Sequence, residues 1–188
     1  ARRAVRGVLL DIDDTLTTDG WLTAEAFAAL AELRAAGKLV VPVTGRPAGW
    51  CDHMARMWPV DAIVGENGAF YFRYDHDARR MTRRYQVDGD AIAANRAKFR
   101  AIGEKIVAAV PGSAIAADQA YRETDLAIDF CEDVRPLERD AIDQIVRLMI
   151  DAGLTVKVSS IHVNGWFGDY HKLSTCQLFV SSELGFEL

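Results

Sequence analysis

The stretch Val-Leu-Leu-Asp-Ile-Asp-Asp-Thr-Leu-Thr, residues 8–17, decides the fold of this chain. Its apolar start is typical of a buried strand in a parallel sheet, and acidic residues follow where that strand ends. Ligands of open α/β sheets bind outside the carboxyl ends of the strands, so Asp11 and Asp13 are candidate functional residues. Alternation along a strand predicts that both carboxylates point the same way, where a hard cation such as Mg²⁺ would relieve their repulsion. The alternative is an acidic turn that caps the next helix.

A second candidate site follows the next apolar run. Residues 38–44 are expected to form a strand, and Thr44-Gly45-Arg46 stands at its carboxyl end. A helix is expected to begin at Pro47, with Trp50, Met54 and Trp58 facing the core. A helix N-terminus attracts anions, which favours phosphate binding by Thr44. A plain helix cap is the alternative role of Thr44.

Two further stretches attract attention on chemical grounds. A third strand over residues 61–65 leads into Glu-Asn-Gly-Ala, in which Asn67 is either part of a tight turn or a substrate contact. Lys172 begins the last expected helix, in which Leu173, Val180 and Leu184 share one side. A lysine at a helix N-terminus opposes the helix dipole, so helix propensity does not explain it. An ordinary surface lysine is the alternative.

Together these stretches resemble the motifs of the haloacid dehalogenase (HAD) superfamily of phosphatases: Asp-x-Asp-x-Thr, Thr-Gly-Arg and a lysine that begins a helix. The Glu-Asn-Gly-Ala stretch resembles subfamily IIB, the sucrose-phosphatase and Cof-like group. The resemblance implies that Asp11 is the nucleophile and that Asp13 is the general acid and then the base. Thr44 and Lys172 would hold the phosphoryl oxygens. Mg²⁺ would be held by the Asp11 carboxylate and the backbone carbonyl of Asp13.

The same resemblance implies a phosphatase that acts on a small phosphorylated metabolite, most often a sugar phosphate in relatives of this kind. A set of residues at the turns and at the expected domain junction would contact the substrate, namely Thr44, Gly45, Arg46, Asn67, His162 and Asn164. For His162 and Asn164 a structural hydrogen bond is the alternative. A phosphomutase on the same fold and a non-catalytic phosphosugar-binding protein are the alternative functions.

The order of the expected elements predicts two domains. Residues 1–69 and 162–188 alternate strands and helices, which indicates a Rossmann-like α/β core with a parallel sheet. Residues 70–161 read as hairpin, helix, strands, helix and strand, which indicates an α+β cap domain inserted into the core. Gly165 and Gly168 predict a mobile or tightly turned loop where the chain returns to the core.

The composition excludes several classes of protein. The 188 residues carry 22 basic and 27 acidic side chains, and the net charge of −5 argues against a nucleic-acid partner. The three cysteines, Cys51, Cys131 and Cys176, are dispersed, which favours reduced thiols in a cytoplasmic protein. The sequence shows no signal peptide and no apolar run long enough for a membrane span. The oligomeric state stays open.

The superfamily's fourth motif, an acidic strand end such as Gly-Asp-x-x-x-Asp, is expected a few tens of residues after Lys172. No such sequence stands between Lys172 and Leu188. We therefore expect the core to be incomplete at this end and the protein to continue beyond Leu188. The magnesium site predicted from these residues is incomplete for the same reason.

Overall fold

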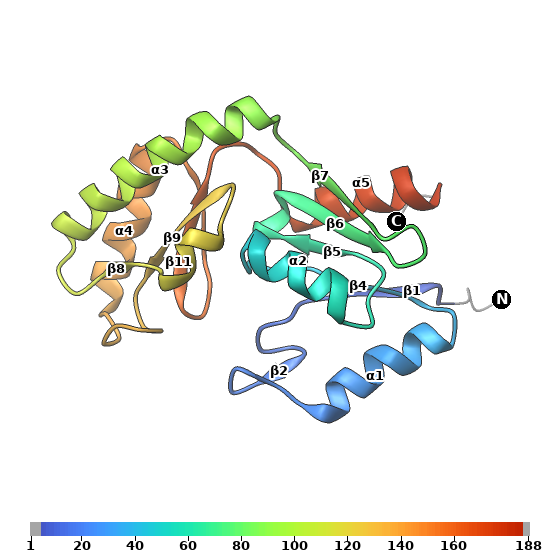
Figure 1. The fold of residues 1–188 in the computed structure, drawn as a ribbon. Coiled ribbons are helices and arrows are strands. Elements are labelled where there is room, and N and C mark those ends of the chain that lie inside the picture. The colour runs from blue at the N-terminus through green and yellow to red at the C-terminus, as the bar shows by residue number, and fades with distance from the viewer. Residues whose placement is uncertain (1–4, 186–188) are drawn as a thin grey trace. The chain divides into compact units, whose positions relative to one another are not determined.

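The computed structural model describes residues 5–185, and the chain divides into two compact units (Figure 1). Unit 1 comprises Ala1–Gln86 and Tyr170–Leu188, and unit 2 comprises Val87–Asp169. Unit 2 is therefore an insertion within the sequence of unit 1. No helix among the described residues is both long enough and apolar enough to cross a bilayer.

Unit 1 is built on five neighbouring strands. Strands β1 (Gly7–Leu10) and β4 (Leu39–Pro42) are parallel, and Leu10 lies opposite Pro42. A parallel bridge between Val43 and Val64 links β4 to the next strand. That strand continues into an antiparallel hairpin, so the second part of the sheet comprises β5 (Ile63–Gly65), β6 (Phe70–Asp75) and β7 (Arg80–Tyr85). The parallel core strands confirm the predicted α/β class.

Helices cover both faces of this sheet because neighbouring residues of its strands point to opposite sides. On one face, Val40 packs with Leu30 of α1 (Ala24–Ala35). On the other face, Val41 packs with Phe179 of α5 (Lys172–Leu184). The remaining elements are α2 (Ala48–Met57), the 3₁₀ turn η1 (Glu66–Gly68) and the small hairpin of β2 (Thr17–Thr18) and β3 (Trp21–Leu22).

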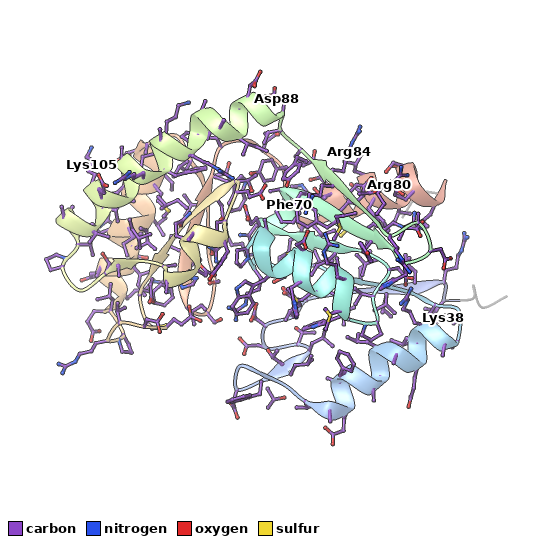
Figure 2. The ribbon with its side chains drawn as sticks, viewed as in Figure 1. Lys38, Phe70, Arg80, Arg84, Asp88 and Lys105 are labelled. Carbon is purple, nitrogen blue, oxygen red and sulfur yellow. The ribbon has the colours of Figure 1, made fainter. Side chains whose placement is uncertain are left out.

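The hairpin of β6 and β7 is anchored by aromatic side chains. Phe70 is fully buried and stacks on Phe72 with 4.2 Å between the ring centroids. Arg80 and Arg84 lie on β7 and point away from the sheet, as Figure 2 shows. Arg80, Arg83 and Arg84 are all exposed to solvent.

Unit 2 is an antiparallel sheet with two helices, in line with the predicted α+β layer. The strand order is β10-β11-β9-β8, and α3 and α4 pack on one face of the sheet. Leu126 and Ile128 of β9 and Val163 of β11 contribute to that packed face. The elements are α3 (Gly89–Ala109), β8 (Ala114–Ile115), the 3₁₀ turn η2 (Ala117–Tyr121), β9 (Asp125–Asp129), α4 (Arg139–Asp151), β10 (Thr155–Val158) and β11 (His162–Trp166).

Both boundaries of the inserted unit differ from the expected positions at 69/70 and 161/162. The hairpin of residues 70–85 belongs to unit 1, because β6 pairs with β5 and Phe72 lies opposite Ile63. Residues 162–166 belong to unit 2, because they form β11 between β9 and β10. The loop expected from residue 162 is therefore a strand over its first five residues.

The predicted faces of two helices also differ from the structure. Leu173 is 56% exposed, and the buried face of α5 is formed by Thr175, Cys176, Phe179 and Val180. Trp50 of α2 is 44% exposed although its spacing predicts a core position. The reason for the Trp50 position is its contact with Arg46, described below.

Candidate active site

The acidic loop begins where β1 ends, at Leu10. Ile12 is buried, and its carbonyl oxygen accepts hydrogen bonds from the backbone N–H groups of Thr15, Leu16 and Thr17. This tight turn, rather than strand alternation, therefore sets the directions of Asp11 and Asp13. The Asp11 carboxylate also accepts a 2.8 Å hydrogen bond from the N–H of Ile12.

Asp11 and Lys172 form an ion pair across 161 positions of sequence, with 2.5 Å between Lys172 Nζ and Asp11 Oδ2. Lys172 is the first residue of α5, where the helix dipole disfavours a positive charge. The carboxylate of Asp11 offsets that unfavourable position. The structure thus brings together two of the four predicted catalytic residues.

Asp13 is held by Arg46 in a two-pronged ion pair. Arg46 Nη2 lies 2.7 Å from Asp13 Oδ1, and Arg46 Nε lies 3.1 and 3.2 Å from the two carboxylate oxygens. The guanidinium group lies 4.7 Å from the ring centroid of Trp50. Stacking of this kind orients an arginine without neutralising it, which explains why Trp50 stays at the surface. Arg46, predicted to contact substrate, here contacts a predicted catalytic acid.

Thr44 and Asn67 meet at the next turn. Thr44 is fully buried, its hydroxyl accepts from the N–H of Arg46 at 3.0 Å, and its carbonyl accepts from the N–H of Asn67 at 3.1 Å. A Cβ atom at Gly45 would lie 3.1 Å from Asn67 Oδ1, so the amide packs tightly over Gly45. Asn67 is 6% exposed, and its Nδ2 has no hydrogen-bond partner among the described residues.

The two loops come from adjacent strands. Leu10 and Pro42 are opposite each other in the parallel pair, and the N–H of Val43 donates to the carbonyl of Leu10 at 2.8 Å. Asp11 follows Leu10 directly, and Thr44 follows Val43. Asp11, Asp13, Thr44, Arg46 and Lys172 therefore gather at the carboxyl end of this strand pair, where open sheets place their ligands.

Glu66 is a functional candidate that the sequence analysis did not single out. Its side chain is fully buried, and Oε1 accepts a 2.8 Å hydrogen bond from the N–H of Ala48, the first residue of α2. The N-cap residue Pro47 makes no side-chain capping bond. Glu66 thus satisfies one N–H group at this helix N-terminus, beside the turn where phosphate binding is predicted.

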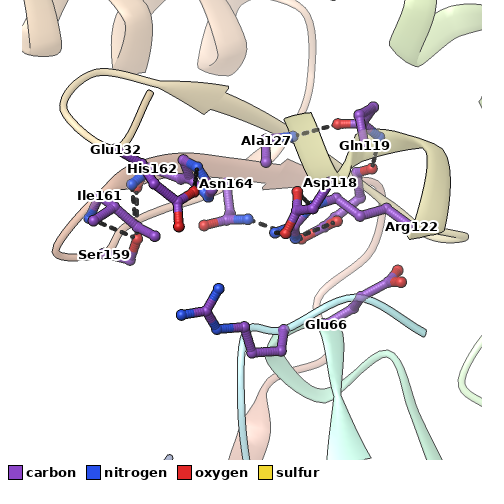
Figure 3. A network of polar contacts seen from close by, with 12 residues as sticks. Glu66, Asp118, Gln119, Arg122, Ala127, Glu132, Ser159, Ile161, His162 and Asn164 are labelled. Atoms are coloured by element: carbon purple, nitrogen blue, oxygen red, sulfur yellow. Dashed lines mark hydrogen bonds and ion pairs between the residues drawn. The ribbon is translucent and has the colours of Figure 1, made fainter. Parts of the chain in front are cut away.

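His162 and Asn164 belong to a polar network within unit 2, shown in Figure 3. Asn164 Nδ2 donates to Asp125 Oδ2 at 3.1 Å, and His162 Nε2 lies 2.9 Å from Glu132 Oε2. Arg122 is almost fully buried and bridges Asp118 and Asp125. Burial lowers the pKa of His162 and raises that of Asp125. Both predicted substrate contacts therefore have structural partners inside their own unit.

A cavity of about 860 Å³ lies at the opposite ends of the strands. Its lining includes Gly7 at the start of β1, Leu39 at the start of β4, and Val180 and Leu184 of α5. None of the predicted site residues lines it. Because ligands of open α/β sheets bind at the carboxyl ends of the strands, its size does not make it the candidate site.

A family model of haloacid dehalogenase-like hydrolases matches residues 8–119, which is more than half of the chain. The chain belongs to the haloacid dehalogenase-like hydrolases. The predicted superfamily, and with it the prediction of an enzyme, is confirmed. A search of curated protein sequences found no match.

Solved structures with the same fold extend this finding. A Thermoplasma acidophilum protein matches with a TM-score of 0.73 at 12% identity, over 97% of this chain and 73% of its own. A trehalose-6-phosphate phosphatase related protein matches with a TM-score of 0.60 at 16% identity, over 90% and 71% of the two chains. A HAD phosphatase of Bacteroides thetaiotaomicron matches with a TM-score of 0.54 at 17% identity, over 96% and 75%. At 12–17% identity these likenesses show that the chain shares their fold.

Proposed function

We propose that this hydrolase cleaves phosphate monoesters of a small metabolite, with Asp11 as the nucleophile. The observation that carries the proposal is the 2.5 Å pairing of Asp11 with Lys172, beside the loop that holds Thr44. A carboxylate next to a fixed ammonium group, at the carboxyl end of parallel strands, suits attack on an anionic phosphoryl group. The reaction has a largely dissociative transition state, so positioned charges supply most of its catalysis.

In the first step, a carboxylate oxygen of Asp11 attacks phosphorus as the ester oxygen leaves, and the product is an aspartyl phosphate. Asp13 gives its proton to the leaving oxygen. In the second step, the Asp13 carboxylate takes a proton from the water that attacks the intermediate. The ion pair with Arg46 fixes the orientation of the Asp13 side chain.

Lys172 and Thr44 complete the phosphoryl site in this proposal. Lys172 Nζ balances charge on the phosphoryl oxygens as well as on Asp11. The buried Asn67 Nδ2 supports a ligand at the Thr44 turn, because an unpaired buried donor is costly until an acceptor reaches it. A phosphoryl or sugar oxygen would satisfy that amide.

The residues of the acidic loop fit Mg²⁺, which generally binds through one or two carboxylates together with substrate phosphate oxygens. Asp11 and the Asp13 carbonyl would hold the ion, which would neutralise phosphoryl charge when bound. Among the described residues no group of three or more His, Cys, Asp or Glu side chains gathers as a metal site.

For the substrate we propose a sugar phosphate. One structure of the same fold is described as a trehalose-6-phosphate phosphatase related protein, and another as an IMP-nucleotidase of Plasmodium falciparum. A panel of sugar phosphates and nucleoside monophosphates, assayed with Mg²⁺ and without an acceptor alcohol, separates these classes. Release of inorganic phosphate under these conditions also distinguishes a phosphatase from a phosphomutase.

Asp11→Asn tests the nucleophile directly. We expect phosphate release to fall by at least about 1,000-fold while the fold is retained, because the amide is a far weaker nucleophile. Asp19→Asn is the matched control, since Asp19 is exposed in a turn with φ of 51°, which asparagine also adopts. Asp11→Asn activity close to that of the control would refute the assignment.

A further inference from the structure

A buried threonine connects the helix of Lys172 to the η1 turn. Thr175 is fully buried, and its hydroxyl donates to the carbonyl of Gly68 at 2.5 Å. The same hydroxyl accepts from Gln86 Nε2 at 2.6 Å, and the backbone N–H of Gln86 donates to the carbonyl of Ala69 at 2.8 Å. One hydroxyl thus joins three segments that are distant in sequence.

This connection acts on the first turn of α5. Thr175 follows Lys172 by three positions, so the two side chains lie on the same face of the helix. Gly68 also packs against the start of the helix, since a Cβ atom there would lie 2.6 Å from the backbone nitrogen of Lys172. The η1 turn therefore holds the helix start both by packing and by a hydrogen bond.

On its other side, the η1 turn contacts the loop that contains Thr44. Asn67 donates its backbone N–H to Thr44, and Glu66 caps α2 at Ala48. The three residues of η1 consequently stand between the loop of Thr44 and the helix of Lys172. A shift of this turn would therefore displace both the loop of Thr44 and the start of the Lys172 helix.

We propose that Gln86, Thr175 and the Gly68 carbonyl form a positioning relay that holds Lys172 at Asp11. The proposal rests on the proposed function for the role of Lys172, although the relay itself touches no reacting atom. Gln86 is the last residue before the chain enters unit 2, and Tyr170 is the first after it returns. The relay thus holds the end of the segment that leaves unit 1 against the helix that begins at Lys172.

The Thr175 hydroxyl separates a role in positioning Lys172 from a role in packing alone. A valine would fill the same space and bury the same apolar surface, but it would leave the Gly68 carbonyl and the Gln86 amide without this partner. The buried Gly68 carbonyl and the half-buried Gln86 amide would then need other partners, and we expect the first turn of α5 to shift as they find them. A displacement of about 1 Å at a catalytic group costs roughly 100-fold in rate.

The test compares Thr175→Val with Thr175→Ser, which keeps the hydroxyl. Ser182→Ala is the matched control, because Ser182 also bonds through its hydroxyl on α5, to Leu178 and Tyr71, but lies ten residues beyond Lys172. With p-nitrophenyl phosphate and Mg²⁺, we expect kcat of Thr175→Val to fall by about 10- to 100-fold with little change in KM. Thr175→Ser and Ser182→Ala should stay within about 3-fold of the parent.

A second readout works without catalysis. A carbodiimide joins a carboxylate to an amine only when the two are in contact, so it should link Asp11 to Lys172 in the parent protein, with the product detected by mass spectrometry. We expect this link to be much weaker in Thr175→Val and retained in Thr175→Ser. If the parent releases no phosphate from any ester, the proposed function fails while this readout still tests the relay. The relay would be refuted if Thr175→Val formed the Asp11–Lys172 cross-link as readily as the parent. It would also be refuted if Thr175→Val were less stable but had an unchanged kcat.

Discussion

Gly68→Ala is the substitution that most directly tests the packing between η1 and α5. Gly68 has φ of 105°, which L-residues rarely adopt, and the added Cβ would lie 2.6 Å from the Lys172 nitrogen and closer still to the carbonyl of His171. The backbone conformation costs about 1–2 kcal/mol. The steric overlap with backbone that cannot rotate away adds about 1–3 kcal/mol. We therefore expect the free energy of unfolding to fall by about 2–5 kcal/mol.

Gly37→Ala separates the two contributions. Gly37 has φ of 69°, and an added Cβ meets no atom within 4 Å, so only the conformational cost of about 1–2 kcal/mol remains. Urea unfolding followed by tryptophan fluorescence is a suitable assay, because Trp21, Trp50 and Trp58 all belong to unit 1. Equal losses in the two variants would refute the claim that Gly68 is required by its contact with the start of α5.

Two predictions concern titrating groups in unit 1. Hydrogen bonding by Arg56, with Arg83 adding to it, lowers the pKa of Asp52, so this carboxylate contributes stability above pH 4 that is lost as the pH falls. Asp52→Asn should therefore be less stable than the parent at pH 7, by no more than about 1 kcal/mol, and the difference in urea midpoint should shrink as the pH falls below 4. Burial raises the pKa of Cys176 to about 11 from 9.0. Iodoacetamide at pH 8 should therefore modify Cys176 about 100-fold more slowly than it does in urea, as peptide mass spectrometry would measure; equal rates would contradict the burial of this thiol.

Much of the candidate site could be predicted because its residues sit at the ends of readable elements. Asp11 and Thr44 each follow a short apolar run, and parallel strands bring such ends together. Lys172 stood out because its place at a helix start is unfavourable without a partner, and that partner is Asp11. In these cases the local sequence itself indicates which tertiary contact the residue makes.

The domain boundaries could not be read in the same way. The sequence of residues 70–85 correctly predicts a hairpin, but it does not say which sheet the hairpin joins, because that depends on pairing with Ile63 to Gly65. Gly165 suggested a loop, whereas it lies within β11, where a Cβ would come within 2.9 Å of Leu154 and Met149. Its small size serves close packing under a helix, a need that only the tertiary structure reveals.

Glu66 was missed because a glutamate in a polar turn usually lies in solvent. The structure buries it completely, and its carboxylate accepts a hydrogen bond from the N–H of Ala48. No local signal distinguishes such a glutamate from a surface one. The same applies to Thr175, whose partners are 89 and 107 positions away.

The charges of the candidate site explain why a divalent cation and a phosphate ester belong together in the proposed reaction. Asp11 pairs with Lys172 and Asp13 pairs with Arg46, so these four side chains sum to no net charge. A phosphate dianion that entered alone would add two negative charges beside two carboxylates, and Mg²⁺ alone would add two positive charges beside a lysine and an arginine. Entry of both keeps the site neutral, and charge neutrality matters most where water is excluded. The two ion pairs thus leave these four side chains without net charge before the cation and the ester enter.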